Sequence, residues 1–158
     1  AEFFGKEFLR EVEPEEFYQN ISKVRAKCGD RPVLRALHFF EEDKRVEQEV
    51  AALQTGDFQG FLDNVQASGN SSFKYLQNTY TNKDVQNQSV PIGLAVSDSI
   101  LQGHGTSRVH GGGFAGTIQA FVADDFVETY RETLDGVYGD GSCHVLKVRP
   151  FGGIQVII

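Results

Sequence analysis

Apolar residues in the first two thirds of the chain recur at helical spacing. Phe17, Ile21 and Val24 are separated by four and three residues, which places them on one face of a helix. Pro14 and the two glutamates after it suit a first helical turn, because proline needs no N–H there and acidic groups favour the positive end of the helix dipole. Similar patterns predict helices at residues 14–27, 31–53, 58–68, 72–80 and 91–101.

The last third of the chain has the pattern of strands. Residues 107–110 and 117–122 are rich in β-branched and alternating apolar positions, and a glycine-rich stretch separates them. A second hairpin is predicted from Cys143–Val148 and Gly153–Ile158, with its turn at Pro150-Phe151-Gly152. Two antiparallel hairpins are therefore expected in this part of the chain.

One further helix is predicted between the two hairpins. Asp124 is a good N-cap because its carboxylate can accept hydrogen bonds from the first free N–H groups, and the helix is expected to end after Val137. Helices followed by an antiparallel sheet predict an α+β fold. A chain of 158 residues has the length of a single domain, residues 1–158.

The stretch between the first two predicted strands has the highest density of glycine. Gly111, Gly112, Gly113 and Gly116 lie within six residues, and a backbone without Cβ atoms can approach a phosphate or another loop closely. The stretch partly matches the dinucleotide fingerprint, the P-loop and the oxyanion-hole segment of esterases. The first requires a helix where a strand is predicted, the second a lysine, and the third a Gly-x-Ser-x-Gly nucleophile that is missing from the sequence. A functional loop and a plain glycine turn both remain open.

Three side chains flank these glycines. Arg108 is equally suited to orienting the loop and to pairing with a surface carboxylate. His110 is expected to pack, and Phe114 is expected to lie in the core beneath the loop. The candidate site residues are Arg108, Gly111, Gly112, Gly113, Phe114 and Gly116.

The second predicted helix carries a run of charges. Residues 41–45 are expected to form a solvated face, on which Glu41 and Arg45 have the spacing of an i,i+4 ion pair. His38 lies beside the apolar face and is expected to be packed and hydrogen-bonded rather than a ligand. The four histidines lack metal-ligand spacing, and no serine or cysteine has an evident base beside it. Neither a metal site nor a catalytic residue is predicted.

The composition excludes some classes of partner. With 15 Lys and Arg against 22 Asp and Glu, the net charge is −7, so nucleic acid is not an expected partner. The sequence has no signal peptide or apolar run of membrane-spanning length, and Cys28 and Cys143 form no disulfide framework. A cytoplasmic protein without a membrane partner is expected. The chain begins at Ala1 and contains no Met, which suggests a fragment or a processed chain.

Several segments, taken in order, resemble galactokinases, which are members of the GHMP superfamily of sugar and small-metabolite kinases. Arg108–Thr117 is similar to the third conserved motif of that superfamily, in its galactokinase form Arg-x-x-Gly-Gly-Gly-Phe-x-Gly. Three earlier segments resemble a Leu-Arg-Glu-Val segment, an Arg-Ala-x-His…Glu…Arg helix and an Ala-Leu-x-x-Gly-Asp stretch of galactokinases. These are Phe8–Val12, Arg35–Phe39 with Glu42 and Arg45, and Ala51–Phe58.

The resemblance is to the C-terminal part of galactokinase. It implies a ferredoxin-like GHMP-kinase C-terminal domain, with an antiparallel sheet packed against helices and a helical N-terminal half. It implies that the glycine loop lines an active site opposite the phosphate loop of an N-terminal kinase domain, whose motifs are missing here. The implied reaction is phosphoryl transfer from ATP, with Mg²⁺, to the anomeric hydroxyl of galactose or a related sugar. ATP and Mg²⁺ would be bound mainly by the N-terminal domain, and this part alone would be inactive.

The sequence departs from the galactokinase pattern at four places. The glycine pair after Phe114 is Ala115-Gly116, and His110 replaces a threonine. Ser68-Gly69 replaces a Ser-His pair, and the aspartate usual in the fifth helix is missing from Gly93-Leu94-Ala95. These differences leave the identity of the sugar open. The alternative function is a stand-alone module, derived from this domain, that binds a small metabolite.

Overall fold

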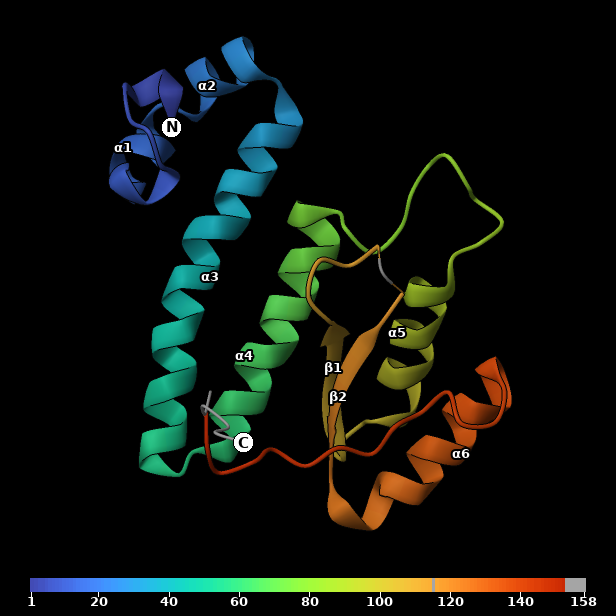
Figure 1. Ribbon diagram of the computed structural model, residues 1–158. Helices are drawn as coiled ribbons and strands as arrows, with labels where there is room; N and C mark the ends of the chain where they lie inside the picture. The colour runs from blue at the N-terminus through green and yellow to red at the C-terminus, as the bar shows by residue number, and fades with distance from the viewer. Residues whose placement is uncertain (115, 153–158) are drawn as a thin grey trace, which may run out of the picture.

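The computed structural model of the chain describes residues 1–114 and 116–152. These residues form an α+β structure in which helices dominate the N-terminal half (Figure 1). The helices are α1 (Pro14–Gln19), α2 (Ile21–Cys28), α3 (Asp30–Thr55), α4 (Phe58–Ser71), α5 (Ser89–Ile100) and α6 (Val127–Tyr138). Two short 3-10 helices, Glu2–Phe4 and Leu9–Glu11, precede them, and a third spans Asp124–Phe126.

The sheet has two antiparallel strands among the described residues, β1 (Gly105–Val109) and β2 (Ile118–Val122). Their register pairs Gly105 with Val122 at one end and Val109 with Ile118 at the other. In Figure 1 the sheet lies between α4 and α5, and α3 packs on the far side of α4. The order α3, α4, sheet, α5 brings the glycine-rich turn close to the C-terminal end of α4.

Two apolar clusters stabilise this arrangement, because each buries side chains from several elements. The first joins the N-terminal helices to α3 around Phe17, which is 1% exposed, and Phe40, which is 3% exposed. The second joins α5, the sheet and α6 around Leu101 and Leu134. Within it the Tyr130 and Ser97 hydroxyls are hydrogen-bonded at 2.8 Å.

The helices are found near their predicted places, with differences at their ends. The helix expected at 14–27 is broken at Asn20, whose side-chain amide donates to the Glu16 carbonyl oxygen at 2.9 Å and so competes with continuation of the helix. The two helices expected at 58–68 and 72–80 are continuous. α4 runs into a π-helical turn, Ser72–Leu76, that ends at Gln77.

Two predictions for the C-terminal part are wrong. Asp124 is not an N-cap; it begins the 3-10 turn, and its side chain makes no capping hydrogen bond. Cys143–Val148 is not a strand in the part of the chain that the structure describes. Val145, Leu146 and Val148 are 56%, 86% and 91% exposed, so their alternation does not reflect a buried face. The predicted partner strand, Gly153–Ile158, lies outside the described residues.

Candidate functional site

The candidate site begins with the loop that joins β1 to β2. The His110 N–H donates to the Thr117 carbonyl oxygen at 3.1 Å, which extends the strand pairing by one step, and the Gly116 N–H donates to the Gly113 carbonyl oxygen at 3.1 Å. Gly111, Gly113 and Gly116 have φ angles of 59°, 85° and 85°. These are left-handed conformations that residues with a Cβ rarely adopt, so the turn requires glycine at these positions.

Gly113 differs from the other glycines because it is buried against another segment. A Cβ at Gly113 would lie 2.0 Å from the Asn78 carbonyl oxygen and 2.8 Å from the Asn78 Cγ. At Gly111, Gly112 and Gly116 no atom lies within 4 Å of the corresponding position. One side of the loop therefore contacts the segment after the π-helical turn, and the other glycines leave open space.

The two side chains expected to pack near the loop are both exposed. Phe114 is 61% exposed, so the prediction that it lies in the core beneath the loop is wrong. His110 is also exposed, and its Nδ1 lies 3.4 Å from Gln119 Oε1. The buried residue that contacts the loop is Asn78, and Thr79 next to it in the chain is also buried. The polar character of both residues gave no sign of burial in the sequence.

Arg108 lies on β1, beside the loop but directed elsewhere. Its Nε donates to the Val109 carbonyl oxygen at 3.2 Å. Its Cβ faces α4, where a Cβ at Gly69 would lie only 2.9 Å away. Burial raises the pKa of Glu49 on α3, and the positive charge of Arg108 partly offsets this shift. The structure therefore brings the glycines and Phe114 together in one loop, and Arg108 faces the helices.

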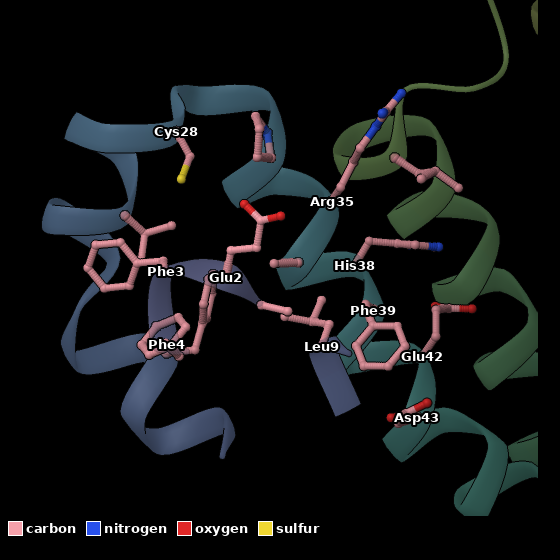
Figure 2. Close-up of a pocket in the computed structure, with 16 residues that line it drawn as sticks. Glu2, Phe3, Phe4, Leu9, Cys28, Arg35, His38, Phe39, Glu42 and Asp43 are labelled. Atoms are coloured by element: carbon pink, nitrogen blue, oxygen red, sulfur yellow. The ribbon is translucent and has the colours of Figure 1, made fainter. Parts of the chain in front are cut away.

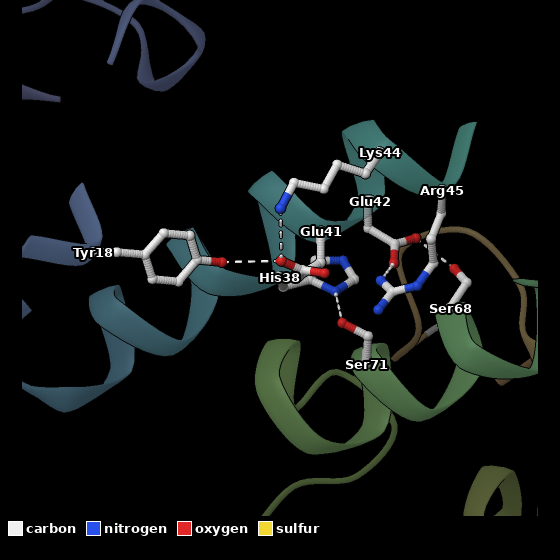
Figure 3. Close-up of polar contacts among 8 residues, drawn as sticks. All are labelled: Tyr18, His38, Glu41, Glu42, Lys44, Arg45, Ser68 and Ser71. Atoms are coloured by element: carbon white, nitrogen blue, oxygen red, sulfur yellow. Dashed lines mark hydrogen bonds and ion pairs between the residues drawn. The ribbon is translucent and has the colours of Figure 1, made fainter. Parts of the chain in front are cut away.

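A polar cluster that was not predicted from the sequence lies between α3 and α4 (Figure 3). Glu42 forms an ion pair with Arg45 and accepts a hydrogen bond from the Ser68 hydroxyl. The side chains of Glu42 and Arg45 are only 24% and 15% exposed. The solvated face expected at residues 41–45 is thus wrong for these two residues, and Arg45 pairs with Glu42 rather than with Glu41. The similarity of their spacing to the galactokinase helix was the available signal.

His38 belongs to the same interface. Its Nδ1 lies 2.9 Å from the Ser71 Oγ, so the prediction of a packed, hydrogen-bonded histidine is confirmed. Burial lowers the pKa of His38 below its usual value, Glu42 opposes this shift, and the charges of Arg45 and Arg108 add to it. His38 is therefore held neutral in the folded chain to a lower pH than in the unfolded chain.

This pKa shift predicts a pH dependence of stability. As the pH falls, the unfolded chain takes up a proton at His38 before the folded chain does, so protonation favours unfolding between the two pKa values. We expect the urea midpoint to fall between about pH 7.5 and pH 5.5, the range in which an ordinary histidine titrates. The fall should be smaller in His38→Gln, which can still hydrogen-bond to Ser71. Equal slopes in the two proteins would contradict this expectation.

A cavity of about 650 Å³ opens between the N-terminal segment and α3 (Figure 2). Its walls are mainly apolar and include Phe3, Phe4 and Phe39, with Arg35, His38 and Glu42 along α3. A cavity of this size and composition can take a small molecule or the side chains of another protein segment. The sequence gave no signal for it, because the cavity depends on how the N-terminal segment packs against α3.

Two classes of feature are missing from the described residues. Across residues 1–114 and 116–152, no group of three His, Cys, Asp or Glu side chains is arranged to hold a metal ion. Within the same residues, no helix has both the length and the apolar character needed to cross a membrane. The candidate site consists of the glycine loop, the buried residues Asn78 and Thr79, and the polar cluster between α3 and α4.

Comparison with known proteins gives one consistent result. A galactokinase of Actinobacillus pleuropneumoniae serotype 3 (strain JL03) is 31% identical over 140 residues, which are 87% of this chain and 34% of that protein. A galactokinase of Glaesserella parasuis serovar 5 (strain SH0165) is 30% identical over 85% of this chain and 33% of its own length. A galactokinase of Haemophilus influenzae (strain PittEE) is 29% identical over 87% of this chain. No protein-family model matches the chain.

These similarities show which class of protein the chain is related to. The chain is a kinase-like sequence in which a glycine loop joins two antiparallel strands. More narrowly, it is galactokinase-like, and the resemblance seen in its motifs is confirmed over most of its length. The chain spans about a third of the length of the curated galactokinases that it matches.

Proposed function

We propose that the chain is the C-terminal domain, residues 1–158, of a galactokinase-like enzyme that phosphorylates galactose or a related sugar at its anomeric hydroxyl. The proposal rests on the similarity to galactokinases. It is supported by the glycine loop, which combines strict backbone geometry with open space around Gly111, Gly112 and Gly116. Among the described residues, no acceptor is hydrogen-bonded to the N–H groups of Gly112 or Phe114. Free backbone N–H groups of this kind suit a phosphate oxygen.

The residues present fit one wall of a nucleotide site and do not fit a metal site. Gly112 and Phe114 would offer N–H groups to a phosphate of ATP, whereas the described residues hold no carboxylate cluster for Mg²⁺. MgATP would supply the phosphoryl group and neutralise its charge. The base, the metal ligands and most of the sugar contacts would belong to an N-terminal kinase domain, so this chain alone would be inactive. Both cysteines are free, which suits a cytoplasmic enzyme.

The loop can be tested with Gly112→Val in the complete enzyme. Gly112 has a negative φ and no atom within 4 Å of its Cβ position, so valine should leave the fold intact. Its branched side chain would cover the N–H groups that face the phosphate. We expect galactokinase activity to fall by at least about tenfold, which corresponds to about 1.4 kcal/mol of lost transition-state stabilisation.

Gly112→Ala is the matched control for bulk at this position, and its single methyl group should cost less activity than valine. Activity would be followed with MgATP and galactose, and folding by circular dichroism. Full activity in a folded Gly112→Val enzyme would rule out the loop as a wall of the active site.

The cavity beside α3 supports one alternative, a stand-alone module that binds a small metabolite. Calorimetry on the chain with ATP, galactose and galactose 1-phosphate separates the two proposals. If the chain supplies only one wall of an active site, it should bind none of the three detectably without its partner domain. Micromolar binding of any of the three would favour the binding module.

A further inference from the structure

The segment under the glycine loop has three features that together suggest a functional role. The turn Ser72–Leu76 is π-helical, and the Gln77 N–H donates to the Ser72 carbonyl oxygen at 2.8 Å. Gln77 then adopts a φ of 55°, and it is the one non-glycine residue with a left-handed φ among the described residues. π-helical turns and left-handed non-glycine residues cost energy and are frequent at functional sites. Here they place Asn78 against Gly113, and Thr79 follows Asn78 in the chain.

Asn78 and Thr79 are buried without satisfying all their polar atoms. Asn78 is 5% exposed and Thr79 is 4% exposed. Within the described residues, Asn78 Oδ1 and Thr79 Oγ1 have no hydrogen-bond partner. Most buried polar atoms in folded proteins are hydrogen-bonded, so two adjacent exceptions require an explanation. Apolar side chains of the same shape would fit this position at a lower desolvation cost.

Unpaired groups of the opposite kind lie in the loop above. The carboxamide of Asn78 lies against Gly113, since its Cγ is 2.8 Å from the position of a Gly113 Cβ. The residues on either side of Gly113 carry the N–H groups of Gly112 and Phe114, which have no acceptor among the described residues. Asn78, whose carboxamide oxygen is unpaired, therefore contacts the loop residue that lies between two N–H groups without an acceptor among the described residues.

We propose that Asn78 is a positioning residue of the glycine loop. When a phosphate binds to the loop, one loop N–H turns inward to donate to Asn78 Oδ1. This bond fixes the peptide planes so that the neighbouring N–H groups face the phosphate. The inference rests on the proposed kinase function and deepens it, because it assigns a residue that orients the loop from outside its sequence motif.

The test uses Asn78→Leu in the complete enzyme, because leucine has nearly the shape of asparagine and lacks its carboxamide oxygen. We expect kcat to fall by at least about tenfold, with the KM for galactose changed by less than about twofold, since the sugar is held by the other domain. The melting temperature should stay the same or rise. Asn78→Asp, which keeps an acceptor oxygen at this position, should recover more activity than Asn78→Leu.

Ser107→Ala is the matched control. Ser107 is 2% exposed and its Oγ is also unpaired among the described residues, but it lies on β1 and not under Gly113. Its activity should equal that of the unaltered enzyme. If Asn78→Leu does not fold, Asn78→Ala is used with the same expectation for kcat.

The outcomes separate this inference from the proposed function. Normal kcat in Asn78→Leu, together with loss of activity in Gly112→Val, would overturn the positioning role alone. A fall in melting temperature that parallels the fall in kcat would also overturn it, because a purely structural residue behaves in that way. Absence of galactokinase activity in the unaltered enzyme would overturn both proposals.

Discussion

Gly113→Ala is expected to destabilise the chain by roughly 2–5 kcal/mol, the sum of a left-handed backbone penalty of about 1–2 kcal/mol and an overpacking penalty of about 1–3 kcal/mol. The first penalty arises because Gly113 has a φ of 85°. The second arises because the new Cβ would lie 2.0 Å from the Asn78 carbonyl oxygen. That neighbour is a backbone atom, so it cannot move aside by a rotamer change.

Urea unfolding of the chain would measure this loss. Gly112→Ala is the control, because Gly112 is the adjacent glycine with a negative φ and an open Cβ position. Its free energy of unfolding should change by less than about 0.5 kcal/mol, as for an ordinary surface substitution. Equal stability of the two variants would show that Gly113 does not rest on Asn78.

Glu42→Ala is expected to cost about 3–5 kcal/mol, because it leaves a largely buried charge without its partner. Arg45 is 15% exposed and has its ion pair with Glu42, and the Ser68 hydroxyl donates to the same carboxylate. Removing Glu42 therefore leaves a cation and a hydroxyl unpaired between α3 and α4. The loss should appear as a lower urea midpoint at neutral pH.

Two further variants test the cause. Glu128→Ala removes an ion pair with Arg131 that has the same i,i+3 spacing, but Glu128 is 71% exposed, so the midpoint should change little. Glu42→Ala combined with Arg45→Leu should be more stable than Glu42→Ala alone, because the unpaired charge is gone. A double variant as unstable as the single one would point to lost packing.

Much of the fold could be predicted because its signals are local. The helical spacing of apolar residues in 31–53 and the alternation in 117–122 are set by the geometry of one element, and both segments form the predicted type of structure. The strand expected at Cys143–Val148 has the same local pattern without a face to bury. Its pattern alone could not show whether another element would cover it.

The candidate site could be predicted only in part. The glycines were evident from their density, and three of them, Gly111, Gly113 and Gly116, have left-handed φ angles. Neither the burial of Asn78 and Thr79 nor the burial of Glu42 and Arg45 could be predicted from the sequence, since both depend on contacts between segments distant in sequence. Polar residues are usually exposed, so burial of these four was not the expected outcome.

The π-helical turn at Ser72–Leu76 also limits how the length of this segment can vary during evolution. A π turn contains one residue more than an α-helical turn, and each residue of an α-helix turns the chain by about 100°. Deleting one residue here would give a regular helix and rotate Asn78 away from Gly113. The exposed stretch 82–87 has no such constraint. Insertions and deletions among related proteins should therefore accumulate in that stretch, and the segment from Ser72 to Thr79 should keep its length.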